Sequence, residues 1–108
     1  MQKMIHVLRC AIYDFARDFN KDPHNEYVTE KAAICKLFSI DTVKLVSDEM
    51  LEIFGGDGYF EDCPYGPTER LYRDCRAMWL EEGAPCVQRI TIAREGQNHG
   101  GKIEYTFD

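Results

Sequence analysis

The longest uninterrupted helical pattern constrains the fold more than any other feature of this sequence. Residues 27–54 contain neither glycine nor proline, and a helix of this length measures about 40 Å. Its apolar residues form two stripes rather than one, and a wide apolar face requires burial against more than one partner. The first stripe contains Ala33, Leu37, Ile40 and Leu51, and the second contains Ile34, Phe38, Leu45 and Met50. We therefore predict the central helix of a bundle, or a helix that also forms an oligomer surface.

Two further segments show helical spacing. Apolar side chains recur every three or four positions through residues 2–20, which is the helical period. Pro23 then ends this helix, because proline excludes the α conformation from the residue before it. Another helix opens at Pro67, followed by Thr68 and Glu69. The positive end of the helix dipole favours the Glu69 carboxylate. The apolar positions of this helix are Leu71, Cys75, Met78 and Trp79.

The last helix is predicted over residues 85–94, with Pro85 near its first position. The tail from Gly96 to Asp108 opens with glycine, asparagine and histidine, which are typical of a break. Only Ile103, Tyr105 and Phe107 alternate along it. The tail is therefore either a short strand or a lead into a further region.

These segments predict an all-α fold, an up-down antiparallel helical bundle of three long-to-medium helices plus a short one. The connections between the helices are short, which places consecutive helices side by side. The central helix is apolar over a wide face. Because it has so few neighbouring helices, part of that face stays uncovered. One helix of the bundle is therefore expected to be missing from this chain.

Charge and composition exclude several classes of function. The chain has 108 residues, a formal net charge of −6 and a pI near 5.0, so neither a nucleic-acid nor a membrane partner is predicted. No apolar run approaches the ~20 residues that span a bilayer, and we expect a cytoplasmic protein. The five cysteines form no C-x-x-C pair and are expected to be reduced thiols, with no metal site. No histidine has a carboxylate or nucleophile at useful sequence spacing, so a hydrolase triad is not predicted.

Two glycine-bearing corners separate the helices and are the candidate site. The first, Gly55-Gly56, follows the long helix, and the second, Glu82-Gly83, precedes the last one. Considered alone, Gly55-Gly56 is equally consistent with a simple helix stop. Position alone likewise favours a solvated loop carboxylate for Glu82.

The motifs around these corners occur in a characteristic order. They are G-G-D-G-Y at 55–59, E-R-L-Y-R-D-C-R at 69–76, E-E-G at 81–83 and Q-R-I-T-I-A-R at 88–94, preceded by A-A-I-C-K-L-F at 32–38. Together they resemble the C-terminal helical domain of acyl-CoA dehydrogenases, over roughly residues 2–95. A single G-G-x-G is weak, whereas the ordered combination is specific. The resemblance implies a three-domain flavoenzyme of fatty acid metabolism, of which this chain resembles the last three helices of the four-helix bundle.

The resemblance assigns roles to both corners. It implies an oxidoreductase in which a carboxylate, here Glu82, removes the α-proton of an acyl-CoA thioester while the β-hydrogen leaves as hydride to FAD. Such a base needs a raised pKa, which burial supplies. Gly83 would let flavin and substrate approach closely, and Gly55 and Gly56 would contact the FAD of a neighbouring subunit. The implied partners are an acyl-CoA, an electron-transferring flavoprotein and further copies of the chain in a homo-oligomer.

The sequence departs from the family pattern beside both corners. Glu52 stands where a cofactor-contacting glutamine is usual, Ala84 replaces a threonine and Cys86 a flavin-contacting glutamine, while Glu81 stands where a tyrosine is frequent. Each of the first three changes removes a side-chain contact with the cofactor or adds a charge that repels a pyrophosphate. They support an alternative function, a non-catalytic oligomerisation or binding module that has lost its flavin contacts.

The resemblance also predicts the domain organisation. Residues 1–95 form the helical domain without the first helix of its bundle, and residues 96–108 form a tail. Because the domains that carry most flavin and CoA contacts lie outside this chain, we expect these 108 residues alone to be inactive and not to retain FAD.

Overall fold

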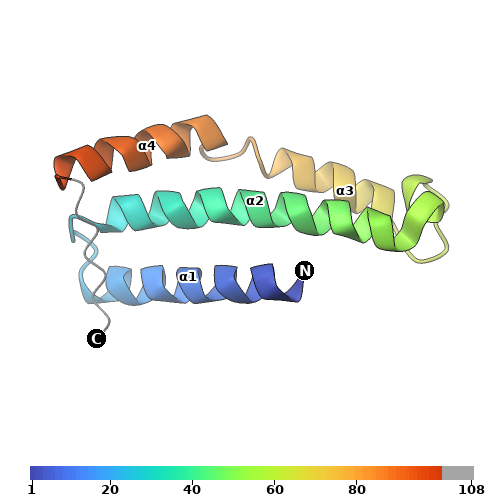
Figure 1. Cartoon of the computed structure of the whole chain (residues 1–108), viewed down its shortest axis with the longest axis horizontal. Helices are drawn as coiled ribbons and strands as arrows, with labels where there is room; N and C mark the ends of the chain where they lie inside the picture. Colours follow the sequence, from blue (N-terminus) through green and yellow to red (C-terminus); the bar gives the residue numbers. More distant parts are fainter. Residues whose placement is uncertain (101–108) are drawn as a thin grey trace.

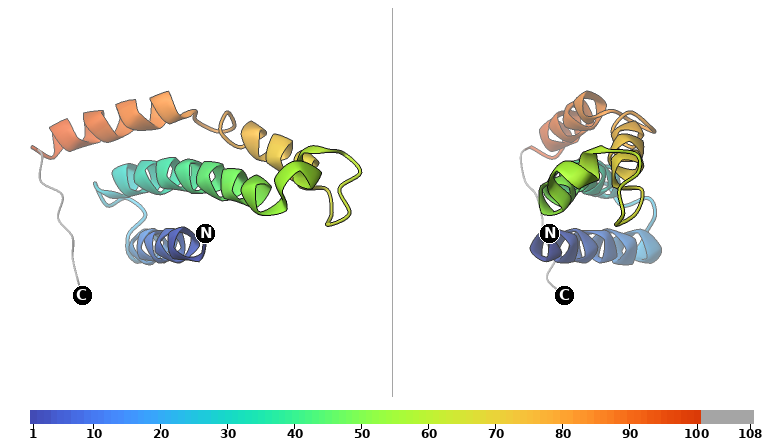
Figure 2. Two further views of the ribbon diagram at one scale, coloured as in Figure 1. Left: turned by 45° about the vertical axis from the view of Figure 1, so that its right-hand side comes forward. Right: turned by 90° about the vertical axis from the view of Figure 1, so that its right-hand side faces the viewer.

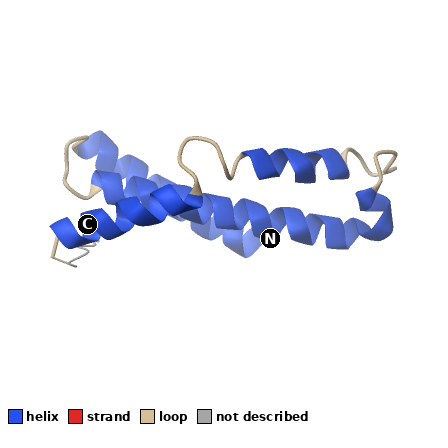
Figure 3. Cartoon of the chain, turned by 90° about the horizontal axis from the view of Figure 1, so that it is seen from above, coloured by secondary structure: helices blue, strands red, loops and turns tan. Residues whose placement is uncertain are grey.

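The computed structural model describes residues 1–100, and every regular element among them is helical (Figures 1 and 3). The elements are α1 (Gln2–Lys21), α2 (Val28–Phe54), the 3-10 helix η1 (Gly55–Tyr59), α3 (Thr68–Ala77) and α4 (Pro85–Asn98). The predicted all-α fold is confirmed. The alternating residues at 103, 105 and 107 lie outside the described residues.

The long helix α2 occupies the centre of the molecule (Figure 1). α1 lies on one side of it, while α3 and α4 follow one another along the other side, and all three run antiparallel to α2. Figure 2 shows that α1 crosses α2 obliquely, because α1 is seen lengthwise in the view where α2 is nearly end-on. Since α2 contacts α1, α3, α4 and η1, the prediction of a central helix with several partners is confirmed.

The predicted end of the third helix was wrong. α3 ends at Ala77, and Met78 and Trp79 lie beyond it in a series of turns. The backbone N–H of Trp79 donates to the carbonyl of Arg76, and that of Leu80 to the carbonyl of Ala77. These bonds reach back three residues, which is the tighter pattern that commonly closes an α-helix.

The predicted end of the fourth helix was also wrong. α4 continues to Asn98, so residues 96–98 belong to the helix and not to a tail. A Cβ added at Gly96 would lie 3.7 Å from the Oε1 atom of Glu30 on α2, so this glycine lies against the neighbouring helix, and packing outweighs its low helix propensity. With 14 residues against 10, α4 is longer than α3, and the short helix is therefore the third.

A buried polar pair joins the last turn of the described chain to the first turn of α2. The carboxylate oxygen Oε2 of Glu30 lies 3.3 Å from Nδ1 of His99, and their side chains are 4% and 6% exposed. The ring of Tyr27 packs on the imidazole, with 4.4 Å between centroids. Sequence spacing did not reveal this pair, because its two residues are 69 positions apart. No serine, threonine or cysteine of residues 1–100 forms a hydrogen bond with the pair, so a triad is not supported in the described part of the chain.

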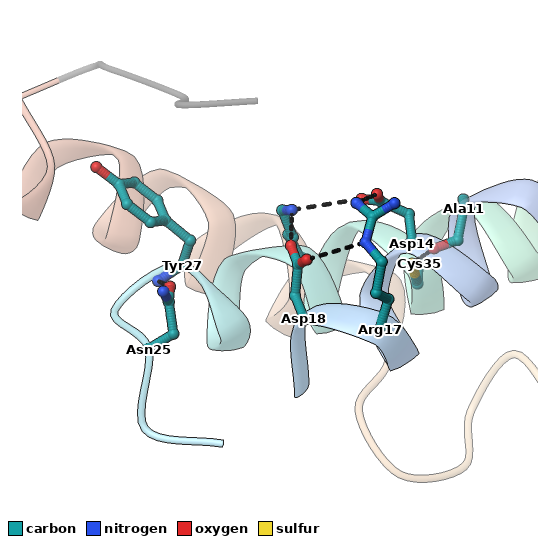
Figure 4. A network of polar contacts seen from close by, with 8 residues as sticks. Ala11, Asp14, Arg17, Asp18, Asn25, Tyr27 and Cys35 are labelled. Carbon is teal, nitrogen blue, oxygen red and sulfur yellow. Dashed lines mark hydrogen bonds and ion pairs between the residues drawn. The ribbon is translucent and has the colours of Figure 1, made fainter. Parts of the chain in front are cut away.

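An ion-pair cluster joins α1 to α2 (Figure 4). The ammonium of Lys31 donates to Asp18 and, at 3.3 Å, to Asp14, while Arg17 lies beside both carboxylates. The hydrogen bond from Lys31 lowers the pKa of Asp18 below its usual value. Burial acts to lower the pKa of Lys31, but its bonds to the two carboxylates outweigh burial and raise it. Because the pKa of Asp18 is depressed in the folded chain, its contribution to stability is present at neutral pH and lost as the solution is acidified.

Few apolar side chains are fully covered. Among the described residues, Ala33 and Ile40 of α2 form the buried hydrophobic core, at 3% and 5% exposure. An apolar groove of about 360 Å³ remains open between α1, α2 and α3, with Ile5, Val46 and Leu71 among its lining residues. The uncovered apolar face expected from the sequence is therefore present.

Candidate functional site

The Glu82-Gly83 corner lies between α3 and α4 and faces the middle of α2 (Figure 1). The backbone is left-handed at both positions, with φ of +48° at Glu82 and +105° at Gly83. Glycine adopts such angles at no steric cost, whereas a residue with a Cβ does not. Glu82 is the one non-glycine residue with positive φ in the described part of the chain.

The α3 side of the corner is fixed by Trp79. Two cations lie over its indole ring, with the Arg76 guanidinium 4.2 Å and the Lys44 ammonium of α2 5.2 Å from a ring centroid. Cation–π contacts of this kind are worth about 0.5–1 kcal/mol each at exposed sites. The Lys44 contact attaches the turn that leads into Glu82 to the central helix, and the Arg76 contact joins it to α3.

The α4 side of the corner is fixed by Gln88. Its Nε2 donates a hydrogen bond to the Gly83 carbonyl at 3.3 Å. A Cβ at position 83 would lie 2.1 Å from that same nitrogen, so the amide occupies the space that a side chain there would need. Pro85 begins α4 directly after the corner, as proline does at a first helical position.

The Glu82 side chain is exposed, and no residue in the described range 1–100 forms a hydrogen bond or ion pair with its carboxylate. Three large apolar side chains of the same region are also exposed, namely Met78 at 52%, Leu80 at 76% and Val87 at 49%. Large apolar side chains exposed near one another are typical of a surface that another molecule or domain covers.

The Gly55-Gly56 corner lies at the far end of α2. Gly55 ends α2 with φ of +59°, as the sequence predicted for a helix stop. A Cβ at Gly55 or at Gly56 would have no atom within 4 Å, so the backbone here is open to a ligand. Within one chain the two corners are separated along α2 and do not form a single site (Figure 1).

Sequence reasoning missed the contact that holds the first corner to α3. The buried Thr68 hydroxyl donates to the carbonyl of the buried Gly58 at 2.9 Å. A Cβ at Gly58 would lie 2.8 Å from Cβ of Phe54, so glycine is required there by packing. The third glycine of the G-G-D-G motif, Gly58, was the sequence signal that could have indicated this close packing.

Metal and thiol chemistry receive no support from the described residues. Residues 1–100 contain no group of three metal-ligating side chains. All five cysteines are free thiols. Burial, chiefly, and the charge of Asp14 raise the pKa of the Cys35 thiol, which donates to the Ala11 carbonyl and is therefore a structural residue. No helix in this part of the chain has the length and hydropathy that a membrane span requires.

Comparison with known proteins identifies the family. The model of the acyl-CoA dehydrogenase C-terminal domain matches residues 1–97. The chain belongs to the acyl-CoA dehydrogenase family. The resemblance read from the ordered motifs is thereby confirmed, and the four helices are consistent with the helical domain of that family.

Curated relatives support the same assignment. Cyclohexane-1-carbonyl-CoA dehydrogenase of Geobacter metallireducens is 35% identical over 91 residues, covering 84% of this chain and 22% of the relative. The mitochondrial isobutyryl-CoA dehydrogenase of Dictyostelium discoideum is 37% identical over 97 residues, covering 88% and 22%. The chain thus spans less than a quarter of the length of these acyl-CoA dehydrogenases. No solved structure matches it.

The departures from the acyl-CoA dehydrogenase pattern lie at exposed or partly exposed positions. Glu52 lies in the last turn of α2, one turn before Gly56, and its side chain is exposed. Ala84 is the N-cap residue of α4 and makes no side-chain cap. Cys86 is exposed in the first turn of α4. None of the three side chains takes part in the contacts that hold the corners in place.

Proposed function

We propose that this chain is the C-terminal domain of an FAD-dependent acyl-CoA dehydrogenase in which Glu82 removes the α-proton of the thioester. The observation that supports the proposal is the backbone of Glu82, which adopts a left-handed conformation although the residue is not glycine. Such strain costs about 1–3 kcal/mol and is concentrated at functional sites. Glycine would adopt this conformation without strain, so the glutamate at position 82 is not explained by the backbone conformation.

Glu82 has the surroundings of a general base that another surface completes. Its carboxylate has no partner within residues 1–100, and Met78, Leu80 and Val87 are exposed in the same region. A carboxylate covered by apolar surface becomes a stronger base, and a positioned base contributes about 10²–10⁴-fold to a proton transfer. The remainder of the flavoenzyme would cover this surface and place the α-carbon near the carboxylate.

The open backbone at the first corner fits the cofactor that the family uses. Gly55 and Gly56 have free space where a side chain would be, so a nucleotide can approach their backbone closely. FAD, when bound, supplies the acceptor for the β-hydride. Gly83 would meet the cofactor through its backbone, on a side other than the one that the Gln88 amide fills. Because the two corners lie apart within one chain, the proposal includes a homo-oligomer in which one copy contributes Gly55-Gly56 to another copy's site.

The substrate proposal is an acyl-CoA thioester, oxidised between its α and β carbons to an enoyl-CoA. Relatives named for cyclohexane-1-carbonyl-CoA and for isobutyryl-CoA support this class. Both acyl groups are branched at the α-carbon, so isobutyryl-CoA is the first probe that we choose. Electron-transferring flavoprotein is the proposed acceptor, and the cytoplasm is the proposed location.

A second candidate function rests on the substituted positions. Glu52 places a carboxylate near the proposed pyrophosphate contact, where like charges repel, and Ala84 and Cys86 lack the side-chain contacts usual in the family. Under this alternative the fold serves oligomerisation or binding without flavin. The visible spectrum of the protein purified from its natural source separates the two functions, because a yellow flavin band supports the enzyme and a colourless protein supports the module.

The direct test replaces Glu82 by Gln in the flavin-containing protein and follows anaerobic flavin bleaching by isobutyryl-CoA. We expect the bleaching rate constant to fall about 10²–10⁴-fold, because a general base is removed, while FAD stays bound. Glu81→Gln is the matched control, since it removes the adjacent exposed carboxylate and should bleach normally. Wild-type bleaching by Glu82→Gln would remove this residue from the mechanism.

A further inference from the structure

The Glu82 backbone needs external support to keep its left-handed conformation. On the α3 side, the backbone hydrogen bonds end with the N–H of Glu81, which donates to the Ala77 carbonyl. On the α4 side, they resume at the Ala84 carbonyl, which accepts from Val87 and Gln88. The peptide groups between these bonds are outside both helices. A residue in a sparsely populated conformation persists only where its surroundings determine it.

One side chain supplies that support at the gap. Nε2 of Gln88 donates to the Gly83 carbonyl at 3.3 Å, and the amide lies where a Cβ of residue 83 would be. The bond fixes the direction of the Gly83 carbonyl, which belongs to the peptide next to the one joining Glu82 and Gly83. Gln88 is itself held by the first turn of α4, where its N–H bonds to Ala84. The orientation of the corner is thereby tied to the start of a helix that packs on α2.

We infer that Gln88 is a positioning residue for Glu82, acting through the Gly83 carbonyl. The inference deepens the proposed function and rests on it, because Gln88 touches no reacting atom and serves only to aim the base. Misplacing a catalytic group by about 1 Å can cost 10²-fold in rate. A single hydrogen bond of this length gives partial control of that position, so loss of the Gln88 amide is expected to lower the turnover rate about tenfold.

The first experiment measures backbone order in the 108-residue chain and needs no cofactor. Gln88→Met keeps a side chain of similar length and removes the amide donor. ¹⁵N relaxation at Glu82 and Gly83 should report order parameters that fall from about 0.85 to below about 0.6, the range of a flexible backbone. Gln97→Met is the matched control, because Gln97 is an exposed glutamine in the last turn of the same helix. Unchanged order parameters in Gln88→Met would overturn the inference.

A charge variant separates positioning from simple packing. Gln88→Glu places an acceptor against the Gly83 carbonyl at neutral pH, so the corner should be mobile. Below the carboxyl pKa of about 4.3, the protonated group donates again and order should return. The wild-type chain over the same pH range is the reference. Mobility in Gln88→Glu that is the same at both pH values would contradict a role for the hydrogen bond.

The second experiment links the corner to the reaction in the flavin-containing protein. With isobutyryl-CoA as probe, Gln88→Met should lower kcat about tenfold with KM little changed, as expected for a residue that acts on the chemical step. If Glu82→Gln abolishes bleaching while Gln88→Met retains wild-type kcat, this inference is wrong and the proposed function stands. If the flavin in Glu82→Gln is bleached at the wild-type rate, the proposed function is wrong. The catalytic part of this inference is then wrong as well. The relaxation experiment would still decide whether Gln88 orders the corner.

Discussion

The two glycine corners of this domain use glycine for different physical reasons. At the first corner Gly55 supplies a positive φ and Gly56 borders open space, so a missing side chain leaves the backbone accessible. At the second corner Gly83 combines a positive φ with a crowded environment, because the Gln88 amide fills the space beside it. The first corner thus leaves its backbone exposed, whereas the second corner is held in its conformation by a side-chain contact.

The difference teaches where a substitution acts. A side chain added at an open glycine without a positive φ, such as Gly56, meets only solvent or a ligand, so it tests binding without disturbing the fold. A side chain added at a crowded glycine displaces its neighbour and strains the backbone, so it tests the fold first. The following predictions separate these two effects, beginning with the largest.

The largest effect on stability is expected for Gly83→Ala. The new Cβ collides with the Gln88 amide, and alanine is strained at φ of +105°. We expect a loss of about 1–3 kcal/mol in the free energy of unfolding, measured by chemical denaturation of the 108-residue chain. In the double variant with Gln88→Ala the collision is absent, so the added loss should be smaller and should reflect backbone strain alone. An unchanged midpoint in Gly83→Ala would show that the second corner is as open as the first.

A smaller loss is expected for Thr68→Val, which keeps the shape of the side chain and removes its hydroxyl. The Gly58 carbonyl would then lose its buried donor, and an unsatisfied buried group costs about 1–3 kcal/mol, with an isosteric change expected at the lower end. Thermal denaturation of the chain is the measurement, and Thr29→Val, at an exposed threonine in the first turn of α2, is the control. Equal melting temperatures for the two variants would mean that the first corner does not depend on this bond.

The smallest effect on stability is expected for Gly56→Ala, because the added methyl meets no atom within 4 Å and φ is not positive. Substitutions at such surface positions usually stay within about 0.5 kcal/mol. In the flavin-containing protein, however, the methyl lies on the backbone proposed to meet FAD, so the dissociation constant of FAD should rise about tenfold or more, equivalent to 1.4 kcal/mol. Unaltered FAD affinity would leave this corner as a helix stop only.

Most of the fold was predictable from helical spacing and from the residues that end helices. The bounds of α1 and α2 follow from their apolar periodicity, from Pro23 and from Gly55. The end of α4 was mispredicted because Gly96 signals a break in sequence, whereas in the structure it packs against Glu30. A short-range pattern does not reveal which glycine faces a neighbouring helix.

The residues of the candidate site could be proposed from the sequence, but their geometry could not. Glu82 and Gly83 followed from the ordered motifs, yet nothing in a glutamate signals a positive φ. The Gln88 contact spans five positions and depends on the tight turn between α3 and α4. The Glu30–His99 pair spans 69 positions and requires α4 to return along α2. The sequence therefore identified candidate residues, and the structure shows which contacts hold them in place.

Trp79 has a consequence for observing this molecule. It is the single tryptophan of the chain, three positions before Glu82, and Arg76 and Lys44 both lie over its ring. Indole fluorescence excited at the red edge of protein absorption therefore originates from the junction of α3 and α4 alone. Any event that moves this junction relative to α2 changes the cations beside the ring and thus its emission. The chain carries its own optical reporter beside the residue proposed to do the chemistry.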